Sequence, residues 1–291
     1  MNQFKTVALL GLLSALLISA SYWLIGGWTG ATIGIVLAAL TNLGSWYYSD
    51  KIALAAYGAQ PVSPNQAPAL HSMVKRLSDR AQLPMPGLYI VSTPAANAFA
   101  TGRDPEHAAV AVTEGILKLL PQDELEAVIA HELTHVRNRD TLTQAVAATI
   151  AGAISFLAQM VSYMMWFGGG SRDEEGPNPL ALMLTMILAP IAATVIQLGI
   201  SRTREFEADA GAARLTGNPK ALARALQRLE NLGRQLPLES NPAFEPLLIS
   251  SPFSRQFLAN LFSTHPSTEA RINNLLKVEK ELSKPSTFQA L

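Results

Sequence analysis

Uncharged apolar runs alternate with polar blocks along the 291 residues of the chain. Residues 6–49 carry no charged side chain, a length sufficient for two helices to cross a bilayer core of about 30 Å. Two more uncharged runs, 141–171 and 176–201, are separated by a short acidic loop. The pattern predicts about four transmembrane helices, paired as hairpins over residues 1–50 and 141–201.

Two other structures can produce similar apolar runs. A cleaved signal peptide would end near residues 19–21, but a second apolar run follows at once and Lys5 is the single positive charge before it. Buried core helices can imitate either of the later runs. Both runs nevertheless exceed the length of about 18 residues at which a spanning helix becomes the better interpretation.

The composition supports a membrane protein and argues against several partners. Hydrophobic residues make up 49% of the chain and charged residues only 15%, an unusual balance for a soluble domain. Lys and Arg together number 22, as do Asp and Glu, so no basic excess favours nucleic acid as a partner. Because the chain has no cysteine, histidine and carboxylate side chains would have to hold any metal ion. The sequence has no G-x-x-x-x-G-K-[ST] motif, which argues against ATP as a partner.

The two polar blocks, 51–140 and 202–291, are expected to form the two halves of one catalytic domain. Most basic residues lie in these blocks, so the positive-inside rule places both blocks and both termini in the cytoplasm. Hydrophobic periodicity and turn residues predict helices at 65–81, 122–139, 202–215 and 220–232, and strands at 88–91, 97–101 and 108–113. The expected fold class is therefore α+β, mainly helical, with a small β-sheet. The four prolines within residues 236–264 predict a loop or lid.

The motif H-E-x-x-H lies within the predicted helix 122–139. One turn of helix places His131 and His135 on the same face with Glu132 beside them, an arrangement that can hold a zinc ion. Glu132 is then the candidate general base for hydrolysis. The alternative is a chance match on a surface helix, but the apolar residues 128–130 give this helix a buried face. An unbroken continuation into the next apolar run would place the site close to the bilayer surface.

A zinc hydrolase keeps one coordination position open, so a third protein ligand is expected from another helix. Within the predicted helix 202–215, Glu205 and Asp209 are four residues apart and share a face, whereas Glu207 points nearly the opposite way. Glu205 is therefore the expected ligand, and Asp209 is expected to orient a ligand imidazole. Glu207 is expected to be a solvated surface charge. Small side chains flank the shared face and would allow a close helix contact: Ala208, Ala212 and Ala213.

Four motifs together resemble one known family. The H-E-x-x-H helix is preceded by N-A-F-A-T-G at 97–102 and followed by S-R-x-R-E-x-x-x-D-A-G-A at 201–212 and T-H-P-S-T-E-A-R-I at 264–272. This order covers nearly the whole chain, includes the four-span layout, and resembles the HtpX family of bacterial membrane zinc metalloproteases, relatives of the CAAX prenyl proteases. The resemblance implies a zincin-like gluzincin fold. It also implies one zinc ion per chain, held by the two motif histidines and Glu205, with Glu132 as the base.

The resemblance further implies a role and a location. We expect a zinc metalloendopeptidase of the bacterial cytoplasmic (inner) membrane that takes part in protein quality control and the stress response. Its partners would be the lipid bilayer and unfolded or damaged membrane proteins, cut at the cytoplasmic face. Two alternatives stay open: a prenyl-peptide processing protease, whose relatives have more spanning helices, and a non-catalytic zinc-stabilised membrane chaperone or scaffold. Glu132 argues against the second, since a structural zinc site needs no base.

Two further segments gain meaning from the resemblance. An edge strand beside the active site would accept a substrate chain as an additional strand through main-chain hydrogen bonds. Its candidate substrate-binding residues are Asn97, Ala98, Phe99 and Ala100. His265 and Arg271 match residues that face the substrate in related proteases. Taken alone, the first segment is an ordinary short strand and a histidine before a proline is more often a turn residue, so both interpretations remain open.

Overall fold

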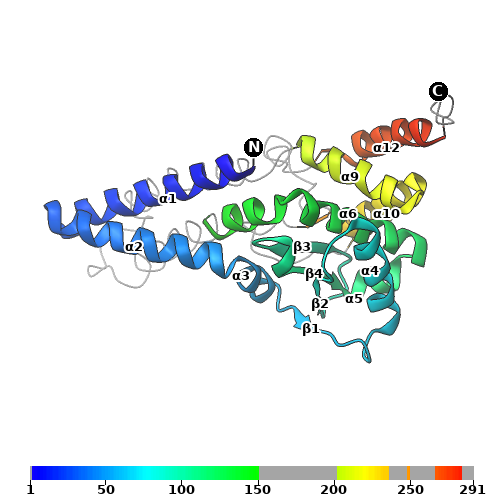
Figure 1. Ribbon diagram of the computed structural model, residues 1–291, viewed down its shortest axis with the longest axis horizontal. Helices are drawn as coiled ribbons and strands as arrows, with labels where there is room; N and C mark the ends of the chain where they lie inside the picture. Colours follow the sequence, from blue (N-terminus) through cyan, green and yellow to red (C-terminus); the bar gives the residue numbers. More distant parts are fainter. Residues whose placement is uncertain (1, 151–201, 236–247, 250–265, 284–291) are drawn as a thin grey trace, which may run out of the picture.

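The computed structural model describes residues 2–150, 202–235, 248–249 and 266–283. It consists of a long helical hairpin and an α+β body in which helices surround a small sheet (Figure 1). The hairpin begins beside the body, extends away from it and returns. A buried hydrogen bond of 2.9 Å between the hydroxyl groups of Thr6 and Thr143 joins the start of the hairpin to the body.

The hairpin is formed by α1 (Asn2–Ile25) and α2 (Gly27–Tyr47), whose backbones approach closely. An added Cβ would lie 2.2 Å from a backbone oxygen of α1 at Gly30, and 2.7 Å from a backbone Cα at Gly34. Small residues four apart on one helix face allow such contact, and this spacing is common where helices associate within membranes. The hairpin interface therefore depends on the absence of side chains at these two positions.

The outer face of α2 carries exposed large apolar side chains: Ile33, Ile35, Val36, Leu37, Leu40 and Leu43. Within the described residues, α2 is the helix long and apolar enough to cross a membrane, and α1 contributes a shorter apolar stretch, Thr6–Ser19. The expected span 176–201 and most of 141–171 lie outside the described residues, although 141–150 are helical. The number of about four spans therefore stays a prediction.

The body contains a mixed sheet of four strands: β1 (Gln60–Pro61), β2 (Gly87–Val91), β3 (Ala98–Gly102) and β4 (Ala108–Thr113). The strand order is β1-β2-β4-β3, with β2 and β4 parallel and the other two pairs antiparallel. Every residue of β3 and β4 is buried, although β3 is an edge strand. The three strands predicted from the sequence are confirmed to within a residue, and the short β1 was not predicted.

Helices supply most of the body: α3 (Ser49–Ala56), α4 (Pro68–Ala81), α5 (Glu114–Leu119), α6 (Gln122–Asn138), α9 (Arg202–Thr216), α10 (Pro219–Gly233) and α12 (Thr268–Leu282). Of these, α3, α5 and α6 pack on the sheet. A short 3-10 turn, Pro105–His107, precedes β4. The mainly helical α+β class and the predicted helices are confirmed, and α3 and α5 were not predicted. The α6 helix does not continue unbroken into the next apolar run, because Arg139 adopts a left-handed φ of 58° before the chain becomes helical again at Asp140.

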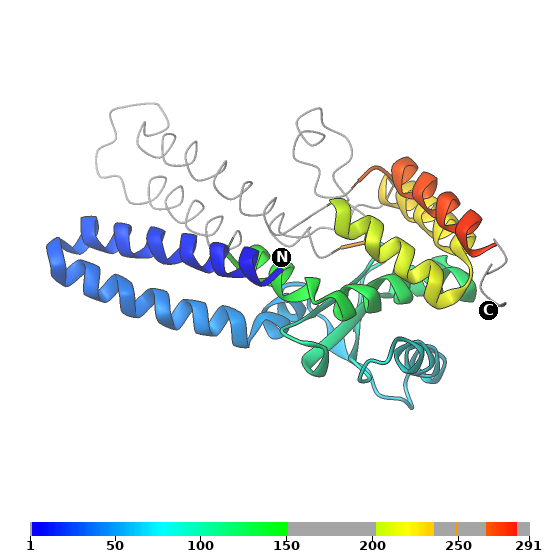
Figure 2. The same cartoon turned by 45° about the horizontal axis from the view of Figure 1, so that its top comes forward.

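Close contact between α6 and α9 positions the candidate site (Figure 2). An added Cβ at Gly211 of α9 would lie 2.4 Å from the methyl group of Thr134 on α6. At the start of α6, the buried carboxylate of Glu124 is held by Arg224 and Arg228 of α10, at 3.0 and 2.8 Å. These contacts fix the relative placement of three helices, which the site requires.

Candidate metal centre

Helix α6 brings the three motif residues to its buried face, because that face packs against β3, α9 and α10. His131, Glu132 and His135 are 1%, 3% and 5% exposed. The two imidazole rings meet edge to face, and their Nε2 atoms are 3.1 Å apart. Two ring nitrogens are thus aimed at one point inside the body.

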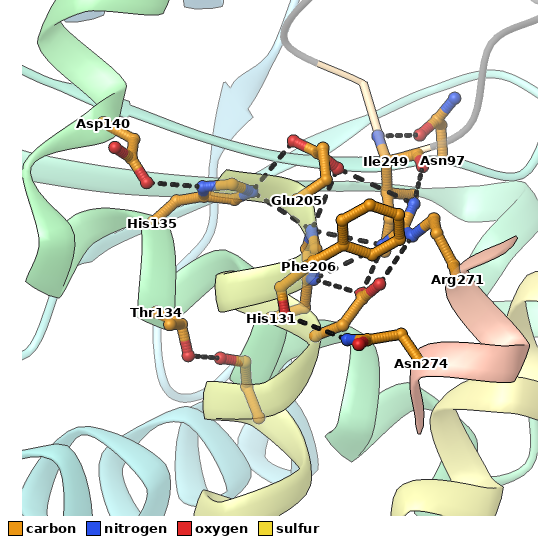
Figure 3. Close-up of polar contacts among 12 residues, drawn as sticks. Asn97, His131, Thr134, His135, Asp140, Glu205, Phe206, Ile249, Arg271 and Asn274 are labelled. Carbon is orange, nitrogen blue, oxygen red and sulfur yellow. Dashed lines mark hydrogen bonds and ion pairs between the residues drawn. The ribbon is translucent and has the colours of Figure 1, made fainter. Parts of the chain in front are cut away.

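Glu205 enters this point from α9 (Figure 3). Its carboxylate oxygens lie 3.8 Å from His131 Nε2 and 3.5 Å from His135 Nε2. Ligand atoms at about 2.0–2.1 Å from a tetrahedral ion are roughly 3.3 Å apart, close to the three separations found here. The donor set and its spacing therefore fit a metal ion, as the shared helical face of Glu205 and Asp209 predicted. Glu207 is exposed on the opposite side of α9.

Asp209 lies beside His131, with 3.0 Å between its Oδ1 atom and His131 Nδ1. Arg271 of α12 donates two hydrogen bonds to this carboxylate, from Nε at 2.9 Å and from Nη2 at 2.6 Å. The neighbouring positive charge keeps the pKa of the Asp209 carboxyl below its ordinary value although burial opposes this. Arg271 itself is 2% exposed, and burial is outweighed by the carboxylates, which raise its pKa.

Asp140 supports His135 in a similar way and was not predicted. Its Oδ2 atom is 3.1 Å from His135 Nδ1, and Arg204 Nη1 is 3.5 Å from its Oδ1 atom. The left-handed turn at Arg139 reverses the chain enough for Asp140 to reach back to the helix it follows. Each histidine thus has a carboxylate at Nδ1, so the proton stays on Nδ1 and the Nε2 lone pair faces the centre.

The two imidazoles differ in their affinity for protons. Burial lowers the pKa of His131 to about 4, and the positive charge of Arg271 adds to this decrease. Burial alone would also lower the pKa of His135, but its hydrogen bond to Asp140 and the charge of Glu205 raise that pKa to about 9. A metal ion between the two Nε2 atoms would compete with protons for both lone pairs.

Glu132 lies beside these donors without belonging to the group of converging ligand atoms. Burial raises the pKa of its carboxyl to about 8, and the negative charge of Glu205 acts in the same direction. The charge of His135 and a hydrogen bond from the Ala100 backbone N–H oppose this increase. A carboxyl with a pKa near neutrality can both accept and return a proton, which general acid–base chemistry requires.

The candidate substrate-binding segment lies along the sheet edge next to Glu132. The Asn97 side-chain oxygen accepts hydrogen bonds from the backbone N–H groups of Ala98 and Ile249, both at 3.0 Å. The side chain of Phe99 packs against the ring of Tyr57, with ring centroids 4.9 Å apart. The buried apolar residues around Phe99 form a different group from those around Ala98. The structure therefore brings the backbone of this segment to the site. His265 lies outside the described residues.

Comparison with known proteins identifies the family. Residues 64–279 match the peptidase family M48. The chain belongs to peptidase family M48.

Within this M48 family the chain is similar to HtpX proteases, as the sequence motifs predicted. The Protease HtpX homolog of Trichormus variabilis is 75% identical over 283 residues, which are 97% of this chain and 98% of that protein. The Protease HtpX homolog of Pyrococcus furiosus is 48% identical over 279 residues, 96% of each chain. A crystal structure of S. mikatae Ste24p is 20% identical, with a TM-score of 0.47 over 83% of this chain and 57% of that chain.

Proposed function

We propose that this M48 protease is a zinc-dependent endopeptidase with one zinc ion per chain. The proposal is carried by one observation, the convergence of His131, His135 and Glu205 beside the buried carboxyl of Glu132. The spacing of the three ligands fits tetrahedral zinc, and two histidines with one glutamate are a donor set used by zinc proteases. A bound zinc ion would act as a Lewis acid that polarises the scissile carbonyl and makes water more acidic.

Glu132 would perform the proton transfers. In its ionised form it accepts a proton from the attacking water, and it then donates that proton to the departing amine. Asp209 and Asp140 keep the ligand imidazoles oriented, because each contacts the Nδ1 atom that faces away from the centre. Arg271 holds the Asp209 carboxylate with two hydrogen bonds, and through Asp209 it positions the imidazole of His131. His265 is retained from the sequence as a candidate donor to the developing oxyanion.

The substrate is an extended, already unfolded chain. A strand added to the edge of β3 would be recognised through its backbone, which is independent of its sequence. Such recognition suits damaged proteins of many sequences. Because the chain has no P-loop motif, substrates must arrive unfolded rather than be unfolded with ATP.

The site of action is the cytoplasmic face of the bacterial inner membrane, where unfolded membrane proteins would be removed as quality control under stress. Support comes from the apolar hairpin and from the exposed aromatic residues near both ends of α2, Trp28 at one end and Trp46 and Tyr47 at the other. Aromatic side chains are enriched at the two interfaces of a bilayer. The guanidinium of Arg103 lies 4.6 Å from the ring centroid of Tyr47, which adds a cation at the end next to the body.

Cleavage of casein by the detergent-purified protein tests the enzymatic proposal. We expect fragments that disappear with a zinc chelator and return when zinc is restored. A protein that binds zinc and casein without cutting would instead be the non-catalytic scaffold. Cleavage of a prenylated peptide but not of casein would support the prenyl-processing alternative.

Single cysteines in this cysteine-free chain test the orientation. A membrane-impermeant maleimide should label Asn65→Cys and Ser267→Cys only after cells are opened, whereas Ser171→Cys should be labelled in intact cells. The expectation follows from the positive-inside rule. Labelling of Ser267→Cys in intact cells would overturn the cytoplasmic assignment.

A further inference from the structure

The outward edge of β3 is defined by the alternation of its backbone groups. Asn97 O accepts a hydrogen bond of 3.0 Å from Thr113 N on the β4 side. In an antiparallel pair the next residue to face the partner is two positions on, so Phe99 also bonds toward β4. The backbone groups of Ala98 and Ala100 therefore point away from the sheet, where an added strand would pair.

Groups of this same chain already fill that edge. The carbonyl oxygen of Ala98 accepts a hydrogen bond of 3.2 Å from Ile249 N, and the Ala100 N–H donates to Glu132. Glu132 belongs to the catalytic machinery, but Ile249 has no role in it. Ile249 follows α9 and α10 in the sequence, yet its N–H reaches the side chain of Asn97 at the start of this edge (Figure 3).

Ile249 is held as a bound peptide residue would be held. Its N–H faces both Ala98 O, at 3.2 Å, and the side-chain oxygen of Asn97, at 3.0 Å. Its carbonyl oxygen accepts a hydrogen bond of 3.0 Å from Arg271 Nη1. Its side chain is 2% exposed in the apolar cluster that contains Ala98, and the preceding Leu248 is 1% exposed. Both backbone polar groups and the side chain are thus satisfied at the edge where a substrate strand would bind.

We propose that Ile249 occupies the position of a substrate residue in the resting enzyme, so that a substrate strand must displace the Leu248–Ile249 segment before it can pair with β3. This inference rests on the proposed protease function. The Leu248–Ile249 segment and a substrate strand exclude each other, because both need the space beside Ala98 O and the hydrogen-bond donor Arg271 Nη1. A substrate residue with an aliphatic side chain would replace Ile249 best, since it fills the same apolar surroundings.

Ile249→Pro tests the displacement because proline lacks the N–H that bonds to Asn97 and Ala98. For the full-length protein in detergent, we expect kcat/KM for casein to rise by about 2- to 10-fold, the size of one net hydrogen bond, mainly through a lower KM. Ile249→Ala keeps the N–H but removes buried side-chain contacts, so it should also raise kcat/KM. A folded Ile249→Pro variant with wild-type or lower kcat/KM would overturn the proposal.

A labelling measurement decides the question even if the proline variant does not fold. In a Glu132→Gln background, which prevents cleavage, the thiol of Ile249→Cys should react slowly with maleimide alone. Saturating casein should increase the labelling rate by about 10-fold or more, because the segment leaves the edge when substrate binds. Casein that binds in a pull-down without changing this rate would overturn the proposal. Wild-type protein that neither binds nor cuts casein would instead overturn the proposed function itself, and this inference with it.

Discussion

The two histidines of the metal centre are supported from different parts of the chain. His131 contacts Asp209 of α9, whose carboxylate receives two hydrogen bonds from Arg271 of α12. His135 contacts Asp140, which follows its own helix directly and whose Oδ1 atom lies 3.5 Å from Arg204 Nη1. One support is built from three elements distant in sequence, and the other depends on a local turn.

This difference shows where the site is vulnerable. A carboxylate and a guanidinium joined by two short hydrogen bonds form a strong and geometrically specific pair. The pair is also fully buried, so the loss of one partner leaves a charge that water cannot reach. Changes on the His131 side should therefore cost more than the matching changes on the His135 side.

Glu205→Ala should have the largest effect, because the Glu205 carboxylate lies close to the Nε2 atoms of both His131 and His135 and is the third proposed metal ligand. We expect zinc content to fall from one ion per chain to almost none, and cleavage of casein to be lost. Elemental analysis of purified protein measures the first and a gel assay the second. Glu207→Ala, two residues away and exposed, is the matched control and should behave as wild type. Retention of zinc by Glu205→Ala with loss in Glu207→Ala would reverse the ligand assignment.

Arg271→Met should destabilise the fold by about 3–5 kcal/mol, because it leaves the buried carboxylate of Asp209 without its counter-charge. Arg204→Met removes the corresponding arginine beside Asp140 and should cost clearly less. Chemical denaturation followed by circular dichroism compares the two variants. Equal losses would show that the two supports are equivalent, contrary to the distances.

Gly211→Ala tests the helix contact that carries α9, and with it Asp209, to His131. The new methyl group would overlap Thr134, so we expect a loss of about 1–3 kcal/mol, typical of overpacking, and weaker zinc binding. The double variant Gly211→Ala/Thr134→Ala should recover most of the stability. A double variant as unstable as Gly211→Ala would place the cause elsewhere, for example in the helix backbone.

Asp140→Ala should have the smallest of these effects. Partners of metal-binding imidazoles typically contribute about 10–100-fold in metal affinity or activity, and the local support should lie near the lower value. Asp209→Ala should lie near the upper value, because Arg271 would also lose its partner. Competition with a zinc-binding dye measures both affinities. A greater loss in Asp140→Ala would mean that the local turn dominates the geometry of the centre.

The sequence predicted the parts of the centre that follow from helix periodicity. His131 and His135 share a face because they are one turn apart, and the same rule selected Glu205 over Glu207 and paired it with Asp209. Short strands were predicted from short runs of residues separated by Pro and Gly turns. The placement of His131, Glu205 and Asp209 was therefore predictable, since each of these residues lies within a regular helix.

The remaining parts depend on backbone geometry that the sequence does not display. Asp140 joins the site because a non-glycine residue, Arg139, adopts a left-handed conformation and interrupts the helix. Ile249 contributes through its backbone, which has no residue-specific signal. Arg271 was predicted from the motif to face the substrate, and the structure shows it buried against Asp209 with one nitrogen on the Ile249 carbonyl. Its direct contact with a substrate stays a prediction.

Parallel measurement of zinc and cleavage in Glu132→Gln tests the central claim most directly. The substitution keeps the shape of the side chain and all three proposed ligands but removes the group that accepts the proton. We predict one zinc ion per chain, as in wild type, with the rate of casein cleavage lower by about 10²–10⁴. Loss of zinc in this variant, or cleavage at the wild-type rate, would contradict the assignment of Glu132 as the base of a zinc endopeptidase.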